Sequence, residues 1–229
     1  MNTGTVEIWH GKVNAEDAHY PAYWRVLDAD EKIHAGKIHN PLLHKRYVEI
    51  HGRLRVLLAQ TLNELPENLN IKKTGHGKPY LADYPELVFN LSHTADRVMI
   101  AVARLCQLGV DIEICKPRHN LSGLVEKCFS EEEAAYWSQL PEPQKNQAFY
   151  RFWTRKEAFV KATGRGIALG LNRCVINSEN FAEFLRVPEL CGQVTAWHIL
   201  DVDLGGEICS AVVADKPFSV IRLMDFAEC

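Results

Sequence analysis

Two short segments near the middle of the sequence combine charged side chains with apolar neighbours. In residues 109–113, Asp111 and Glu113 alternate with apolar residues, as side chains on one face of a β-strand do. In residues 152–161, Glu157 and Lys161 have the spacing of neighbours on one helix face, and Lys156 stands beside that face. Three carboxylates next to fixed ammonium groups suit a magnesium ion that holds a phosphate-rich ligand. This pattern predicts a phosphoryl-type transferase.

Each segment also has an ordinary structural interpretation. Asp111 and Glu113 could form the solvated face of an edge strand, and Glu157 with Lys161 could be an exposed helical pair worth about 0.2–0.5 kcal/mol. Two features favour a site instead. Carboxylates on so apolar a strand are costly to bury unless a cation or hydrogen-bond donors offset them. The helix face also begins at Trp153 and is flanked by aromatic residues, which argues against simple solvation.

The elements that position these residues can be predicted from periodicity and end signals. Apolar residues recur at helical spacing over 40–65, where Pro66 ends the pattern. Ser130 and Glu133 match a capping box, which predicts a helix to about residue 139, and a second helix over 144–163 is followed by a glycine. The expected strands cover residues 6–9, 24–27, 87–91, 98–103, 109–114, 174–176, 194–199, 208–214 and 220–223, with residues 92–96 as a turn.

The order of these elements repeats coarsely along the chain. In each half a long helix precedes a glycine turn, residues 75–77 and then 164–166, and a strand pair follows. This predicts an α+β fold, a pseudo-dimer of two similar lobes over residues 1–107 and 108–229 with a ligand cleft between them. Chance similarity of two α+β segments is the alternative. No low-complexity linker separates the halves, so we expect the lobes to pack together.

Composition excludes several classes of partner. Lys and Arg total 26 against 29 Asp and Glu, a net charge of −3, so no global charge favours nucleic acid or a membrane surface. Basic residues outnumber acidic ones over 45–78, which could hold an anionic ligand or simply reflect a patchy surface. The seven cysteines are scattered without a C-x-x-C pair, and residues 1–9 lack a signal sequence. The longest apolar run is too short to cross a bilayer. We expect a soluble cytoplasmic protein.

The two charged segments have a known counterpart. Gly-Val-Asp-Ile-Glu at 109–113 followed by Phe-Trp-Thr-Arg-Lys-Glu-Ala-Phe-Val-Lys at 152–161 resembles the signature of 4′-phosphopantetheinyl transferases, in particular the large surfactin-synthetase-activating (Sfp-like) class. Further matches to that class follow one another in its order, and they are residues 51–55 (HGRLR), 77–80 (GKPY), 89–93 (FNLSH) and the Phe129-Ser130 pair with Glu133. Each motif is weak alone, but together they are specific.

This resemblance implies a fold and a reaction. Enzymes of this class are pseudo-dimers of two α+β lobes with coenzyme A in the cleft. They use Mg²⁺ to transfer the 4′-phosphopantetheine arm of coenzyme A to a serine hydroxyl of an apo acyl or peptidyl carrier protein, and they release 3′,5′-ADP. The choice between Mg²⁺ and Mn²⁺ stays open, as does the client carrier protein. The two-lobe design implies a monomer.

The resemblance also implies roles for individual residues. The implied metal ligands are Asp111, Glu113 and Glu157. The implied contacts to coenzyme A are Lys45, Arg46, Lys73, Lys78, Ser92, His93, Asp111, Lys116, Glu157 and Lys161, with Lys45, Arg46 and Lys116 resting on looser matches. Glu157 and Lys161 would be catalytic. Glu157 or a metal-bound water would accept the proton of the attacking serine, and the family pattern does not decide which.

Other functions remain compatible with the residues alone. The same carboxylates could serve another metal-dependent nucleotide transferase, or the chain could be a non-catalytic module that binds coenzyme A or carrier proteins. Ser92-His93 alone would be a local turn cap. His93 has no partners for a nucleophilic triad, and the histidines form no H-E-x-x-H metal motif.

Overall fold

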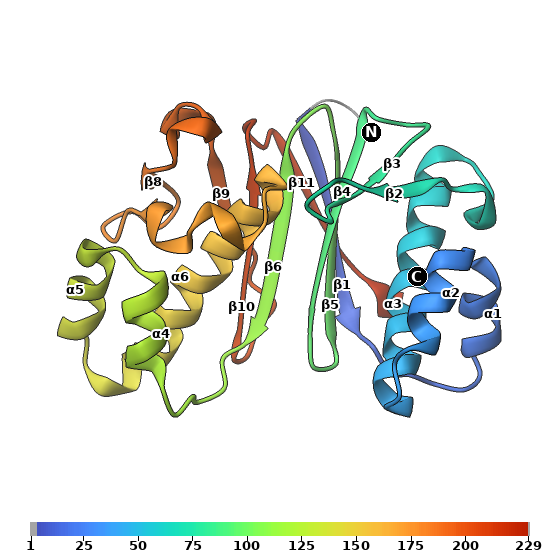
Figure 1. The fold of residues 1–229 in the computed structure, drawn as a ribbon, viewed down its shortest axis with the longest axis horizontal. Helices are drawn as coiled ribbons and strands as arrows, with labels where there is room; N and C mark the ends of the chain where they lie inside the picture. Colours follow the sequence, from blue (N-terminus) through green and yellow to red (C-terminus); the bar gives the residue numbers. More distant parts are fainter. Residues whose placement is uncertain (1–3, 229) are drawn as a thin grey trace.

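The computed structural model describes residues 4–228, whose two larger sheets pack face to face between two layers of helices (Figure 1). Two further pairs of short strands, β2 with β3 and β7 with β8, form small separate sheets. Met1–Thr3 and Cys229 lie outside the described residues. Two features named in the sequence analysis therefore lie partly or wholly outside the described residues, namely the segment 1–9 and the seventh cysteine. Among residues 4–228, none of the helices combines the length and the apolar character that crossing a bilayer would require.

The first sheet is built mainly from the first half of the chain. Its strand order is β11-β1-β5-β4, with β1 parallel to β11 and antiparallel to β5. The elements of this half are β1 (Thr5–Lys12), α1 (Tyr20–Val26), α2 (Ala29–Gly36), α3 (Pro41–Leu62), β2 (Ile71–Lys73), β3 (Pro79–Leu81), β4 (Leu87–Thr94) and β5 (Arg97–Arg104). Helix α3 packs on the outer face of this sheet.

The second sheet has the strand order β6-β10-β9 and is covered on its outer face by α6. The elements of this half are β6 (Leu108–Ile114), α4 (Leu121–Cys128), α5 (Glu131–Gln139), α6 (Glu142–Thr163), β7 (Val175–Ile176), β8 (Phe184–Arg186), β9 (His198–Asp201), β10 (Ile208–Ala214) and β11 (Val220–Asp225). Strand β11 leaves this half and pairs with β1, so the end of the chain completes the first sheet.

Several predicted elements are confirmed because their ends are encoded locally. The capping box at Ser130 and Glu133 is formed in both directions and starts α5. Asn40 caps α3 through its side chain, and Gly164 ends α6 with a φ of 67°. Helix α6 begins two residues before the predicted residue 144, at Glu142.

Other predicted elements are wrong. Residues 24–27 are not a strand, because Trp24 belongs to α1, where its ring stacks on Tyr20 and on His44 of α3. A short apolar run does not distinguish a strand from a buried helix, and packing against α3 decides the outcome here. Residues 92–94 continue β4 instead of forming a turn. Residues 194–196 form a short 3₁₀ turn, and α2 and α4 were not predicted.

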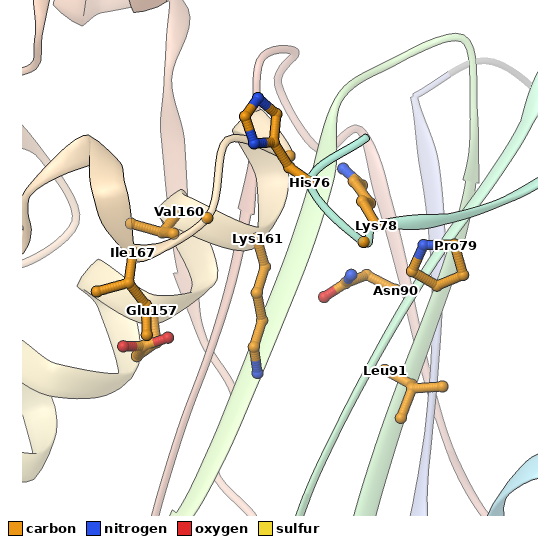
Figure 2. A pocket seen from close by; sticks show the side chains of 12 residues that line it. His76, Lys78, Pro79, Asn90, Leu91, Glu157, Val160, Lys161 and Ile167 are labelled. Carbon is orange, nitrogen blue, oxygen red and sulfur yellow. The ribbon is translucent and has the colours of Figure 1, made fainter. Parts of the chain in front are cut away.

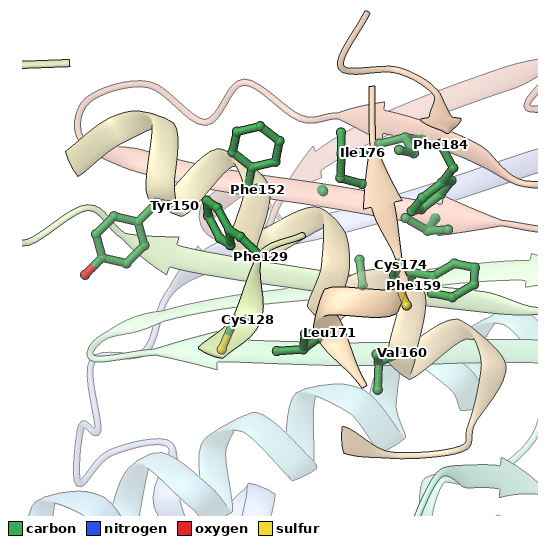
Figure 3. Packing of buried hydrophobic residues seen from close by; sticks show 14 of the residues in the cluster. Cys128, Phe129, Tyr150, Phe152, Phe159, Val160, Leu171, Cys174, Ile176 and Phe184 are labelled. Carbon is green, nitrogen blue, oxygen red and sulfur yellow. The ribbon is translucent and has the colours of Figure 1, made fainter. Parts of the chain in front are cut away.

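The core beneath α6 explains the position of Lys156. Aromatic side chains of α6, including Phe152 and Phe159, pack against Phe129 and Phe184 (Figure 3). The prediction that Lys156 stands beside the Glu157–Lys161 face is wrong, because Lys156 is buried in this cluster against Phe129. Its ammonium lies 2.6 Å from a carboxylate oxygen of Glu133 and donates to two backbone carbonyl groups. Residue 156 lies on the side of α6 that faces α5, whereas residue 161 lies on the side that faces β6. Of these two lysines, only Lys161 therefore pairs with a strand carboxylate.

Gly109 sets how closely α6 approaches β6. A Cβ atom at this position would lie 2.0 Å from the carbonyl oxygen of Ala158 and 2.3 Å from the backbone nitrogen of Ala162. Both contacts are to helix backbone, which cannot move aside as a flexible side chain would. The absence of a side chain at Gly109 therefore brings the helix face with Glu157 and Lys161 close to the strand.

Gly109→Ala is expected to destabilise the fold by about 3 kcal/mol, the upper part of the usual range for overpacking. Urea unfolding followed by circular dichroism measures this change. Gly36→Ala is the matched control, because a Cβ at Gly36 meets no atom within 4 Å. Equal stability of the two variants would show that α6 can shift away from β6 at little cost.

Candidate active site

Several of the residues predicted for the site lie together where strand β4 of the first sheet meets strand β6 of the second. Val110 and Ile112 of β6 pack between the sheets, while Asp111 and Glu113 point to the other face. The Ser92 hydroxyl donates to Oδ1 of Asp111 at 2.8 Å. Two strands of different sheets thus supply neighbouring side chains.

Helix α6 adds Lys161 to this pair. The Lys161 ammonium donates to Oδ1 of Asp111 at 2.7 Å and to the Ser92 hydroxyl oxygen at 2.9 Å. Asp111 is 5% exposed, and its second oxygen, Oδ2, is buried with no hydrogen-bond partner among residues 4–228. A buried carboxylate oxygen without a donor is costly, so the site has unsatisfied capacity for a cation or a donor.

The three predicted carboxylates influence one another electrostatically. Burial raises the pKa of Asp111, although the Lys161 ammonium opposes this shift. Burial also raises the pKa of Glu113, and the Asp111 charge adds to the rise. For Glu157, burial and then the charges of Asp111 and Glu113 raise the pKa. The negative charges are therefore close enough to repel, which a bound cation would relieve.

The carboxylates do not form a tight three-residue cluster. Across residues 4–228, no group of three or more His, Cys, Asp or Glu side chains has an arrangement that could hold a metal ion. Glu157 projects from α6, on the opposite wall from the β4 residues (Figure 2). The metal-ligand set of Asp111, Glu113 and Glu157 stays a prediction.

A pocket opens between these walls. It has a volume of about 260 Å³, and both halves of the chain line it (Figure 2). Its lining includes Lys78, Asn90, Leu91, Glu157, Lys161 and Ile167. A second pocket of about 540 Å³ lies next to it, and the two share Pro79 and Leu91. The lining of the second pocket is mixed in charge, with Lys72 and Lys73 of β2 and the acidic Asp28, Asp30 and Glu31.

The remaining predicted contacts have different surroundings. Lys78 lines the first pocket, but its ammonium donates to the carbonyl oxygens of Leu108 at 2.9 Å and Ala162 at 2.7 Å. The side chain of His93 is exposed near the end of β4. Lys45 pairs with Asp17 at 2.5 Å. The three residues that rest on looser family matches do not line either pocket among the described residues. They are Lys45, Arg46 and Lys116.

Two residues of β4 contribute to the site without having been assigned a role from sequence. The Asn90 side-chain oxygen accepts the Val110 backbone N–H at 2.8 Å, and the Thr94 hydroxyl donates to Oε2 of Glu113 at 3.0 Å. With Ser92, they are alternate residues of one strand and share a face. Extending the predicted strand from residue 91 to 94 would have revealed this row of polar side chains.

Burial of Lys78 predicts a pH-dependent stability. Burial lowers its pKa from the ordinary 10.5 to about 8, so between these values the unfolded chain binds more protons than the folded protein. The contribution of Lys78 to the free energy of unfolding therefore increases as the pH rises from about 8 to 10.5, by at most about 3 kcal/mol. Urea unfolding at pH 8 and pH 10 measures how the free energy of unfolding changes with pH. Lys78→Met should reduce this change, whereas Lys127→Met, the control at an exposed site, should retain it. Equal slopes in both variants would contradict this assignment.

Comparison with known proteins identifies the family. A family model described as the 4'-phosphopantetheinyl transferase superfamily matches residues 107–213. The chain is 33% identical over 216 residues to the 4'-phosphopantetheinyl transferase HetI of Nostoc sp. (strain PCC 7120), an alignment that covers 93% of this chain and 88% of that protein. The chain belongs to the 4′-phosphopantetheinyl transferase family.

Shorter similarities extend to other members of this transferase family. Identity is 37% over 141 residues with the 4'-phosphopantetheinyl transferase psf-1 of Bacillus pumilus, which covers 58% of each protein. It is 39% over 110 residues with AcpT of Escherichia coli strain K12, which covers 48% of this chain and 55% of that protein. The chain is thus an enzyme of the phosphopantetheinyl transferase class, and the matched superfamily region contains Asp111, Glu113, Glu157 and Lys161.

Proposed function

We propose that this transferase moves the 4′-phosphopantetheine arm of coenzyme A to a serine hydroxyl of an apo acyl or peptidyl carrier protein, in a Mg²⁺-dependent reaction that releases 3′,5′-ADP. The observation that carries this proposal is the pocket between the two halves, where Glu157 and Lys161 of α6 face residues of β4. We assign the enzyme to the large Sfp-like class on the order of its motifs along both halves.

The donor set fits a magnesium ion. Magnesium in proteins is held by one or two carboxylates together with waters and substrate phosphate oxygens, so it does not require a preformed cluster of three. Asp111 has a buried oxygen without a donor, and the repulsion among Asp111, Glu113 and Glu157 favours a cation. These three residues would hold the ion. When bound, it would neutralise charge on the pyrophosphate of coenzyme A.

The lysine and the glutamate of α6 would act directly on the reactants. Lys161 would contact the pyrophosphate as a point charge, since its ammonium already lies at the wall of the pocket. Glu157 is our candidate for the proton acceptor of the attacking serine. Its side chain lines the pocket together with Lys161, where the attacking serine would enter.

The nucleotide end of coenzyme A would lie along the adjoining pockets. Ser92, His93 and Lys73 would contact its phosphates or nucleotide, because Lys73 lines the second pocket and Ser92 lies beside Lys161. Lys78 uses two of its three ammonium hydrogens on carbonyl groups, which leaves one for a ligand. Lys45, Arg46 and Lys116 would contribute through rearrangement or at the rim.

The proposal includes an architecture. Residues 1–107 and 108–229 would form the two lobes of a pseudo-dimer, with β11 returning to the first sheet. Each proposed lobe contains one 22-residue helix packed on an antiparallel strand pair, α3 with β4 and β5, and α6 with β6 and β10. The enzyme would act as a cytoplasmic monomer on carrier proteins, without nucleic acid or membrane partners.

The deciding experiment is the intact mass of an apo acyl carrier protein and an apo peptidyl carrier protein after incubation with the enzyme, coenzyme A and Mg²⁺. We expect a gain of one phosphopantetheine arm, release of 3′,5′-ADP and loss of both with a chelator. Binding of coenzyme A without any mass gain would contradict the proposed reaction. A mass gain that survives the chelator would contradict only the metal requirement.

A further inference from the structure

Strand β4 contacts strand β6 through a row of side chains rather than through a ladder of backbone hydrogen bonds. Asn90 accepts from the backbone of Val110, Ser92 donates to Asp111, and Thr94 donates to Glu113. The last two contacts end on carboxylates that are proposed metal ligands. The Ser92 hydroxyl also accepts from Lys161, whereas the Thr94 side chain forms a hydrogen bond with Glu113 and with no other residue among 4–228, so its effect can be isolated.

Thr94 occupies a well-fixed position. It is the last residue of β4 and pairs with Arg97 of β5, in a register that runs without interruption from Leu87 to Thr94. The turn of Ala95 and Asp96 follows at once. A β-branched side chain on a strand has restricted χ1 freedom, so the Thr94 hydroxyl points in a defined direction.

Glu113, by contrast, has little else to orient its carboxylate. Within the described part of the chain, Thr94 is the only side chain that donates a hydrogen bond to it, and no lysine, arginine or histidine forms an ion pair with it. Its side chain is only partly buried. A glutamate has several rotatable bonds, and ordering them costs free energy that a single fixed donor offsets.

We propose that Thr94 is a positioning residue that orients the Glu113 carboxylate for the metal ion. This inference rests on the proposed function. Hydrogen bonds to a ligating carboxylate fix its orientation, and their loss typically weakens metal affinity or activity about 10–100-fold. Thr94 itself touches neither the metal nor the substrate in this proposal.

The test is a Mg²⁺ titration of the intact enzyme with two readouts. One is the rate of arm transfer at saturating coenzyme A, and the other is the rise in melting temperature with Mg²⁺ in the presence of coenzyme A. For Thr94→Val, which keeps the shape and removes the hydroxyl, we expect the Mg²⁺ midpoint of both readouts to increase about 10–100-fold. At saturating Mg²⁺ we expect the transfer rate to recover most of its wild-type value.

Three further variants make the result specific. Thr94→Ser restores the hydroxyl and should return the midpoint close to that of the wild type. Thr61→Val is the matched control, because the Thr61 hydroxyl donates to the Leu57 carbonyl inside α3. In a Glu113→Ala background, where no side-chain oxygen remains to accept from Thr94, Thr94→Val should add little, because the two changes remove one shared interaction.

The outcomes separate the two proposals. A wild-type Mg²⁺ midpoint in a folded Thr94→Val variant would overturn the role of Thr94 and leave the transferase function intact. Equal additional weakening in the Glu113→Ala background would also overturn it. A wild-type enzyme that transfers the arm with no response to Mg²⁺ would overturn the metal assignment and the role of Thr94 together.

Discussion

Glu157→Ala is expected to lower the rate of arm transfer to an apo carrier protein by about 10²–10⁴-fold, the range typical for loss of a general base. Glu157 lines the pocket, and its pKa is raised by burial and by the negative charges of Asp111 and Glu113. Its replacement would remove both a proton acceptor and a proposed metal ligand. The carrier-protein mass assay under initial-rate conditions measures the change.

Glu142→Ala is the matched control for this experiment. Glu142 lies in the first turn of the same helix, α6, and its carboxylate is 84% exposed. This variant should transfer the arm at the wild-type rate. Full transfer by Glu157→Ala would show that the site lies elsewhere, whereas equal losses in both variants would point to damage of α6 rather than of the pocket.

Lys156→Met is expected to lower the free energy of unfolding by about 3–5 kcal/mol. The Lys156 ammonium and the Glu133 carboxylate lie 2.6 Å apart, and their side chains are 0% and 1% exposed. Methionine preserves the volume but leaves Glu133 as a buried charge without its cation. Among the described residues, only the backbone N–H groups of Ser130 and Ile176 would then donate to it. Urea unfolding followed by tryptophan fluorescence measures the loss.

Two comparisons isolate the charge effect. Lys156→Met combined with Glu133→Gln should recover part of the stability, because the uncompensated charge is removed. Arg186→Met, which breaks the exposed ion pair with Glu132, should change stability by less than about 1 kcal/mol. A loss of similar size in Lys156→Met and Arg186→Met would contradict the structural role of the buried pair.

The residues that sequence reasoning placed correctly are those with local signals. The start of α5 depends on Ser130 and Glu133, three residues apart, and the end of α6 depends on Gly164 at a positive φ. The alternation of β6 similarly separates Asp111 and Glu113 from the residues between the sheets. Each of these signals lies within a few residues of the feature that it determines.

The wrong predictions concern residues whose structure depends on contacts with residues distant in the sequence. Trp24 is helical because α1 packs on α3, and residues 92–94 remain in β4 because β5 pairs with them to the turn. Lys156 has the same charge as Lys161 and lies close to it in sequence, yet its partner is the buried Glu133 of α5. A helical period indicates that the two lysines face differently, but not which neighbour each face meets.

Sequence alone therefore determined the chemical types at the site and the family, because motif order and residue spacing are properties of the chain itself. Tertiary structure alone decided that Ser92 and Lys161 meet Asp111, that Lys78 joins β6 to α6, and that Thr94 is the partner of Glu113. These contacts join residues from different sheets and layers. Their distances depend on packing, above all on the close approach of α6 at Gly109, which no local pattern encodes.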